Sequence, residues 1–166
     1  MDFQAYVRPV PGFLPDTRPY LDITPLLADA EAFGAAVEAM AEPVRTLQPT
    51  HVLALESRGF IFGSALAQKL GLGLVPARRA GRLPRETFSE PHGAEALEIH
   101  ADAFKAGDRV LIVDDILASG GTAVAARRLV ERTGAQPLAL TLFIEVDALQ
   151  GRTRLEGLPV FSVLRA

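Results

Sequence analysis

Apolar residues recur along this chain at two spacings, which predict alternating helices and strands. Apolar positions three and four residues apart are typical of one helix face, and short unbroken apolar runs are typical of buried strands. Helices are predicted at 29–42, 59–70 and 122–133. Strands are predicted at 51–56, 72–78, 108–114, 138–145 and 158–164. Strands that alternate with helices indicate an α/β domain with a mainly parallel sheet.

Two segments show neither the helix spacing nor the strand spacing. Residues 1–25 contain five prolines and are expected to be irregular, because proline removes a backbone donor and restricts the residue before it. Residues 79–98 carry mixed charge with little periodicity, which is typical of a lid, a binding loop or a disordered stretch. Because neither a repeat nor a low-complexity linker divides the chain, we predict a single domain over residues 1–166.

Composition narrows the classes of function. With 49% hydrophobic and 22% charged residues in 166, the chain has the composition of a globular protein that can bury a core. The absence of cysteine excludes disulfides, thiolate nucleophiles and Cys-ligated metal sites. A formal charge of −3 gives no basic footprint, so nucleic acid is not an expected partner. The apolar runs are too short to span a bilayer and the start lacks a secretory pattern, so we expect no membrane association and a cytoplasmic location.

The most informative stretch is residues 110–122, with the sequence Val-Leu-Ile-Val-Asp-Asp-Ile-Leu-Ala-Ser-Gly-Gly-Thr. It predicts a buried strand with Asp114 and Asp115 at its carboxyl end, then a small-residue loop that opens a helix. Ligands of parallel α/β sheets bind beyond the carboxyl ends of strands, and backbone N–H groups at a helix N-terminus bind anions. The two acids would hold hydroxyls or a metal-associated group, so a ribose 5-phosphate fits both halves. Either feature alone is common in tight connections, but the joint pattern favours a binding site.

This stretch resembles the phosphoribosyl-diphosphate (PRPP) motif of the type I phosphoribosyltransferases. Residues 56–63 (Glu-Ser-Arg-Gly-Phe-Ile-Phe-Gly) and 76–87 (Pro-Ala-Arg-Arg-Ala-Gly-Arg-Leu-Pro-Arg-Glu-Thr) resemble segments of the adenine phosphoribosyltransferases, and 22–27 and 97–103 match as well. The segments follow the family's order from about residue 11 to the carboxyl end. The resemblance implies the type I phosphoribosyltransferase fold, with helices flanking a mainly parallel sheet. It also implies a flexible loop at 79–100 and a small base-binding hood at 1–28.

The resemblance further implies an activity and a set of site residues. The activity is transfer of the phosphoribosyl group from PRPP to adenine, giving AMP and pyrophosphate in purine salvage, with Mg²⁺ held through PRPP rather than by the protein directly. The implied residues are Ala118, Ser119, Gly120, Gly121 and Thr122 for the 5′-phosphate; Ser57, Arg58, Gly59 and Arg82 for pyrophosphate; Tyr20 and Leu21 for the base; and Asp114, Asp115 and Glu90 for catalysis. By analogy with this fold, a homodimer is also expected.

The chain departs from the family pattern in two places, which leaves alternatives open. The loop is shortened, so the family's proposed proton-handling Glu falls on Glu90 or on Pro91, and His92 stands near the family's Tyr. In the base-binding segment, Tyr20-Leu21 replaces Phe-Arg. The alternatives are therefore a phosphoribosyltransferase for another nucleobase, or a regulatory protein that binds PRPP without turnover.

Overall fold

The computed structural model describes residues 1–16 and 18–166. The chain falls into two compact units, residues 1–39 and 40–166, which we describe separately. The helix α2 (Ala30–Ala41) spans the boundary between them and agrees with the helix predicted at 29–42. The single-domain organisation and the base-binding hood expected from the sequence stay predictions.

The first unit is more regular than its prolines suggested. After a short 3₁₀ helix, η1 (Phe3–Tyr6), strands β1 (Arg8–Val10) and β2 (Tyr20–Asp22) pair antiparallel, and α1 (Thr24–Ala28) follows. Before α1, Asp22 accepts hydrogen bonds from the backbone N–H and the hydroxyl of Thr24, the first residue of the helix, at 2.9 and 3.0 Å. Proline is tolerated here because β1 belongs to a two-stranded sheet, in which each strand has a free edge. The expectation of an irregular segment over residues 1–25 was therefore wrong for strands β1 and β2 and for the start of α1.

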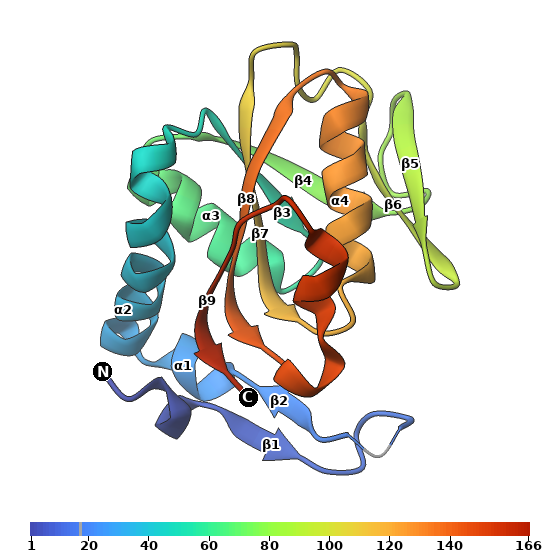
Figure 1. Cartoon of the computed structure of the whole chain (residues 1–166). Coiled ribbons are helices and arrows are strands. Elements are labelled where there is room, and N and C mark those ends of the chain that lie inside the picture. The colour runs from blue at the N-terminus through green and yellow to red at the C-terminus, as the bar shows by residue number, and fades with distance from the viewer. Residues whose placement is uncertain (17) are drawn as a thin grey trace. The chain divides into compact units, whose positions relative to one another are not determined.

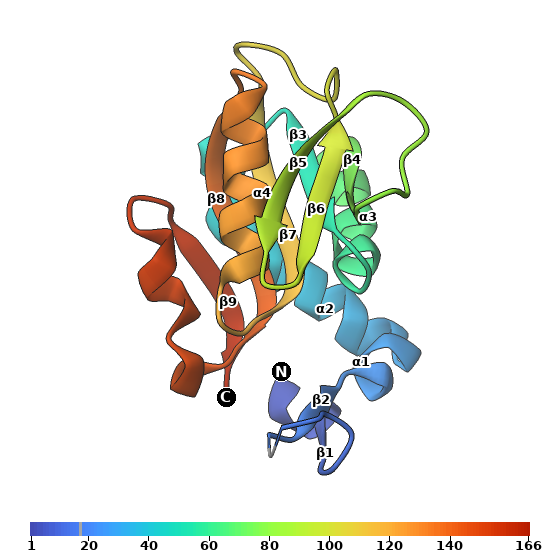
Figure 2. The same cartoon turned by 90° about the vertical axis from the view of Figure 1, so that its right-hand side faces the viewer.

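Among its described residues, the second unit forms a seven-stranded sheet of order β5-β6-β4-β3-β7-β8-β9 (Figures 1 and 2). The strands are β3 (His51–Leu55), β4 (Gly73–Arg79), β5 (Thr87–His92), β6 (Glu95–His100), β7 (Arg109–Leu117), β8 (Gln136–Glu145) and β9 (Val160–Arg165). The five strands from β4 to β9 in this order pair in parallel, and β6 and β5 extend the sheet antiparallel. The predicted mainly parallel sheet is confirmed.

Two long helices of this unit pack on opposite faces of the sheet. On β3, Val52 and Ala54 face α3 (Gly59–Leu70), and Leu53 and Leu55 belong to the core cluster that includes α4 (Gly121–Arg132). Successive side chains of a strand point to opposite faces, so the two helices sandwich the sheet. Both helices agree closely with the sequence prediction. Three short 3₁₀ helices complete the unit: η2 (Glu42–Leu47), η3 (Asp147–Leu149) and η4 (Gly151–Leu155).

The structure differs from the sequence expectation in two places that affect the site. Strand β7 continues to Leu117, three residues beyond the predicted end, because Ile116 and Leu117 keep pairing with β8. Residues 87–100 form a hairpin rather than an unstructured stretch, with a turn at Gly93, where φ is +59°. The hairpin lies beside α4 (Figure 2), and its Leu97 and Ile99 are fully buried.

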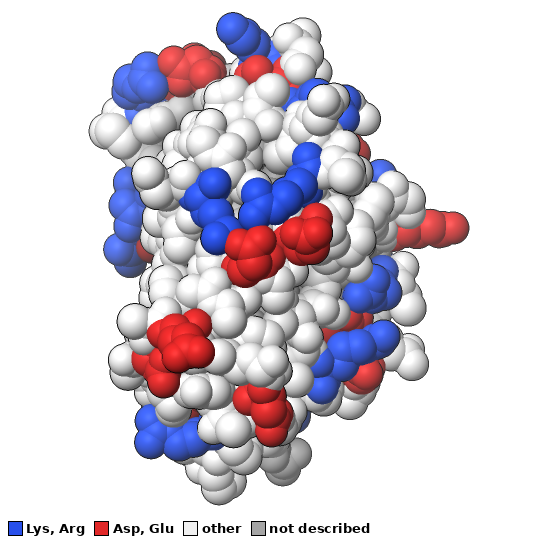
Figure 3. Space-filling view, turned by 90° about the vertical axis from the view of Figure 1, so that its left-hand side faces the viewer, with Lys and Arg blue, Asp and Glu red and all other residues white. Residues whose placement is uncertain are grey.

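The surface carries charges of both signs. On the face in Figure 3, Lys and Arg lie next to Asp and Glu, and uncharged surface separates the groups. None of the helices formed by residues 1–16 and 18–166 is long and apolar enough to cross a membrane.

Close packing of α3 on β3 makes a stability prediction. A Cβ atom on Gly63 would overlap the Cβ of Ala54. Gly63→Ala is therefore expected to lower the free energy of unfolding by about 1–3 kcal/mol, since overpacking forces the backbone apart. Urea denaturation measures this loss. The control is Ser64→Ala, at an exposed position of the same helix, which should change stability little; an equal loss in both variants would contradict the packing argument.

Candidate functional site

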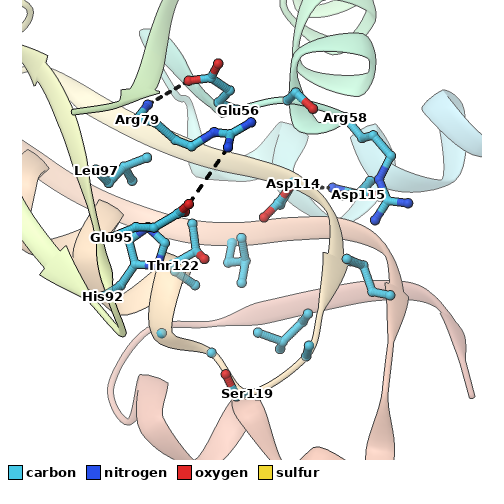
Figure 4. A pocket seen from close by; sticks show the side chains of 18 residues that line it. Glu56, Arg58, Arg79, His92, Glu95, Leu97, Asp114, Asp115, Ser119 and Thr122 are labelled. Atoms are coloured by element: carbon cyan, nitrogen blue, oxygen red, sulfur yellow. Dashed lines mark hydrogen bonds and ion pairs between the residues drawn. The ribbon is translucent and has the colours of Figure 1, made fainter. Parts of the chain in front are cut away.

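A cavity of about 360 Å³ opens at the carboxyl ends of β3, β4 and β7, and the β5–β6 hairpin reaches over it (Figure 4). This is the place where the sequence analysis expected a ligand. Most lining residues come from the ends of these three strands and the segments after them, and the others come from the β5–β6 hairpin, the start of α4 and β8. They are Glu56, Ser57, Arg58, Arg79, His92, Glu95, Leu97, Asp114, Asp115, Ile116, Leu117, Ala118, Ser119, Gly120, Gly121, Thr122, Ala123 and Leu140.

The segment of residues 118–122, called the 118–122 loop below, consists of the connection from β7 to α4 and the first two residues of that helix. Gly120 has φ +84° and precedes the first turn of the helix, where the Val124 N–H donates to its carbonyl at 3.0 Å. A Cβ on Gly120 would stand 2.6 Å from the carbonyl oxygen of Gly151, so only glycine fits. The loop thus presents backbone N–H groups beside the cavity at the N-terminus of a 12-residue helix, an arrangement that binds anions.

Asp114 and Asp115 lie within β7 rather than after it, and the strand therefore fixes both backbones. The Asp115 N–H donates to Oδ1 of Asp114 at 2.9 Å. Burial raises the pKa of Asp114 well above its usual value, and the neighbouring charge of Asp115 adds to this rise, although part of the side chain reaches the cavity. Burial also raises the pKa of Asp115, against the opposing effect of Arg58. An ionised Asp114 would gain from hydroxyl donors that a ligand brings.

Arg58 is the N-cap residue of α3, lines the cavity and pairs with Asp115. Its Nε lies 2.7 Å from Oδ2 of Asp115, whose side chain is only 7% exposed. Gly59 allows this approach, because a Cβ there would stand 2.8 Å from Oδ1 of Asp114. Ser57 precedes Arg58 and also lines the cavity. The structure thus brings the predicted 56–59 segment against the predicted acidic pair.

Glu56 is a residue of the site to which the sequence analysis gave no role. Its carboxylate, 7% exposed, accepts a hydrogen bond from Nη2 of Arg78 at 3.2 Å and from the backbone N–H of Arg79 at 2.6 Å. Burial acts to raise the pKa of Glu56, but these hydrogen bonds outweigh it, so the pKa is lowered. Glu56 is the first residue of the Glu-Ser-Arg-Gly segment, and this position could have identified it as a site residue from the sequence. Glu56 ties the end of β3 to the end of β4.

The hairpin brings further residues to the cavity that the sequence analysis did not assign. Glu95 faces Arg79, whose Nη1 lies 3.8 Å from its Oε1, and His92 lies over Thr122 (Figure 4). These positions depend on how the hairpin packs on α4. No local motif could reveal them.

In the second unit, Glu90 and Arg82 do not line this cavity, and Tyr20 and Leu21 belong to the first unit, which is described by itself. Glu90 does not line the cavity, because its carboxylate pairs with Nη1 of Arg132 on α4 at 3.1 Å. Arg82 lines a separate cavity of about 600 Å³, between the 79–82 turn and the hairpin. Tyr20 and Leu21 lie on β2 of the first unit. The roles given to these four residues stay predictions.

The side chains around the cavity indicate how a metal ion could be bound there. Among the residues that the structure describes, no group of three or more His, Cys, Asp or Glu side chains could hold one. Four carboxylates line the cavity, those of Glu56, Glu95, Asp114 and Asp115. Arg78 and the Arg79 backbone engage Glu56, the Arg79 side chain engages Glu95, and Arg58 engages Asp115. Such a set fits Mg²⁺ that brings most of its ligands with a phosphorylated substrate.

Comparisons with known proteins agree with this geometry. The family model of the phosphoribosyl transferase domain matches residues 26–162. The chain is 51% identical over 169 residues to the adenine phosphoribosyltransferase of Carboxydothermus hydrogenoformans, with 99% of both chains covered. A crystal structure of adenine phosphoribosyltransferase from Rhodothermus marinus superposes with a TM-score of 0.94 at 43% identity, covering 99% of this chain and 96% of that one. The Saccharomyces cerevisiae enzyme, solved with adenine and an imino-altritol bisphosphate, gives 0.91 at 36% identity, with 98% and 97% covered.

Proposed function

This chain belongs to the adenine phosphoribosyltransferase family, and we propose that it transfers the 5-phosphoribosyl group of PRPP to adenine, giving AMP and pyrophosphate. One observation carries the proposal beyond family membership. The 118–122 loop, the Asp114–Asp115 pair and Arg58 surround a single cavity, which offers an anion site, hydroxyl acceptors and a cation in one place. PRPP carries one chemical group that suits each of these features: a phosphate, a diol and a pyrophosphate.

Each part of the cavity would bind one part of PRPP. The backbone N–H groups of the 118–122 loop, with the hydroxyls of Ser119 and Thr122, would donate to the 5′-phosphate. Asp114 and Asp115 would accept from the 2′- and 3′-hydroxyls of the ribose. The guanidinium of Arg58 and the Ser57–Gly59 backbone at the start of α3 would hold the pyrophosphate.

In the reaction, the bond from C1′ to the pyrophosphate oxygen breaks and a bond from C1′ to N9 of adenine forms. Positive charge develops on the ribose ring as the pyrophosphate leaves, and Arg58 would stabilise the leaving anion. The N9 proton must also leave. The resemblance suggests Glu90 as the group that accepts this proton, and Glu90 pairs with Arg132 in this structure. The titratable hairpin side chains that line the cavity are His92 and Glu95.

We also propose that the reaction depends on Mg²⁺. When bound to PRPP, the ion would neutralise part of the pyrophosphate charge. Asp114 and Asp115 would hold the ribose hydroxyls of the PRPP that carries the ion, and would not bind the ion directly. The homodimer and the cytoplasmic location stay predictions that rest on the family and the sequence.

A panel of bases tests the proposed function. The protein is incubated with PRPP, Mg²⁺ and, separately, adenine, hypoxanthine, guanine, xanthine or orotate, and pyrophosphate release is measured. Release with adenine alone is expected, and excess EDTA should abolish it. Release with another base only would support the first alternative, a transferase of different specificity. Binding of PRPP without release with any base would support a regulatory protein.

A further inference from the structure

A 3₁₀ helix far from the loop in sequence packs directly behind the 118–122 loop. The first residue of η4, Gly151, has no room for a side chain, because a Cβ atom there would overlap the carbonyl oxygen of Ala118. The contact is reciprocal, since a Cβ on Gly120 would stand 2.6 Å from the carbonyl oxygen of Gly151. The two backbones thus meet without side chains between them.

The same helix also contacts the loop through a guanidinium group. Nη1 of Arg154 donates to the carbonyl oxygen of Ser119 at 3.2 Å. The same atom would lie 3.5 Å from a Cβ placed on Gly121, so it rests against the loop over two residues. Two consecutive loop carbonyls, those of Ala118 and Ser119, are therefore directed toward η4.

The direction of these carbonyls fixes the direction of the loop's N–H groups. In a planar trans peptide the C=O and the N–H point in opposite directions. The N–H groups of Ser119 and Gly120 therefore point away from η4. Both residues line the cavity, so η4 sets the aim of two of the donors that the proposed function assigns to the 5′-phosphate.

Side-chain contacts hold η4 itself in place. Arg152 donates from Nε to Glu145 at 2.9 Å and from Nη1 to the carbonyl of Val160 at 2.7 Å, which anchors the helix on β8 and β9. A segment fixed at these points can support the loop rather than follow it.

We propose that Gly151 and Arg154 are positioning residues for PRPP. They keep the carbonyls of Ala118 and Ser119 directed toward η4, so that the N–H groups of the next residues can bind the 5′-phosphate. This inference rests on the proposed function, because it assigns the loop to that phosphate. It places two determinants of PRPP affinity outside every motif that the sequence analysis recognised.

The test separates the two ends of PRPP. In Arg154→Ala, the affinity for ribose 5-phosphate, measured by calorimetry, is expected to fall about three- to tenfold. This size corresponds to the loss of one exposed hydrogen bond. The KM for PRPP should rise in parallel, while the affinity for pyrophosphate and the KM for adenine stay unchanged. Arg154→Lys, which keeps a donor and the charge, should recover most of the affinity. Gly151→Ala should show the same selectivity with a larger loss, and circular dichroism establishes that it folds.

The matched control is Arg127→Ala, which removes a guanidinium–carbonyl hydrogen bond to the residue after η4 and leaves the loop contacts in place. It should leave the affinity for ribose 5-phosphate unchanged. The proposal is overturned if Arg127→Ala weakens ribose 5-phosphate as much as Arg154→Ala does, or if Arg154→Ala weakens pyrophosphate equally. Failure of the wild-type protein to bind ribose 5-phosphate at all would instead overturn the proposed function.

Discussion

Asp114→Asn is expected to lower kcat/KM for PRPP about 100-fold while it stabilises the ligand-free protein. The loss of activity follows from replacing a charged acceptor of the ribose hydroxyls by a neutral amide, and hydrogen bonds to charged groups contribute about 1.5–3 kcal/mol each. The gain in stability follows from the raised pKa of Asp114, which reflects burial and the adjacent charge of Asp115. Steady-state kinetics and thermal unfolding measure the two effects.

The sign of the stability effect depends on pH. A carboxyl group whose pKa is raised on folding destabilises the folded state once it ionises, so stability is lost as the pH rises above the pKa of the unfolded chain, about 3.9. The advantage of Asp114→Asn should therefore be present at pH 8 and vanish near pH 4. The contrasting variant is Asp115→Asn. The pKa of Asp115 is also raised by burial, but the 2.7 Å pair with Arg58 opposes that rise, so this variant should stabilise the protein less than Asp114→Asn does. Equal stabilisation by both variants would contradict this account.

Parts of the fold whose signals are local could be predicted closely from the sequence. The helix α3 occupies the predicted residues 59–70 because its apolar face is regular and Gly71, at φ +68°, ends it. The end of β7 was missed, because the charged pair Asp114-Asp115 interrupts the apolar run that continues in Ile116 and Leu117. Pairing with β8 carries the strand across the acids, and that partner lies some 30 residues away in sequence.

In the candidate site, too, features encoded locally were visible in the sequence, and features that depend on distant residues were not. The 118–122 loop and the acidic pair are contiguous in sequence, so their chemistry was visible before the structure. The roles of Glu56 and Arg154 depend on partners more than 20 residues away, Arg79 and Ser119 respectively. The hairpin shows the converse case, since the resemblance alone suggested a role for Glu90, and its pairing with Arg132 was not visible in the sequence; the proposed role stays a prediction. Side-chain direction in a hairpin follows its register and packing, which a single sequence does not define.

Arg58→Ala is expected to raise the KM for PRPP about 100-fold, with little effect on the KM for adenine. Arg58 is proposed to bind the leaving pyrophosphate, and the loss of a bidentate guanidinium contact to phosphate oxygens removes more than one charge-assisted hydrogen bond. Pyrophosphate should also fail to inhibit the variant at concentrations that inhibit the wild type. Initial rates over a grid of PRPP and adenine concentrations give both KM values.

A second effect of this substitution must be separated from the first. Removing Arg58 also leaves the buried Asp115 without its ion-pair partner, which destabilises the protein. In the Asp115→Asn background the ion-pair partner of Arg58 is already gone, so adding Arg58→Ala there should cost less stability than it does in the wild type. The further rise in the KM for PRPP should persist in that background, because the contact to pyrophosphate does not involve Asp115. If the rise disappears together with the stability cost, Arg58 acts only by holding Asp115, and the pyrophosphate contact is excluded. Proportional rises in both KM values would lead to the same conclusion, since a residue that binds only the leaving group has no reason to affect the base.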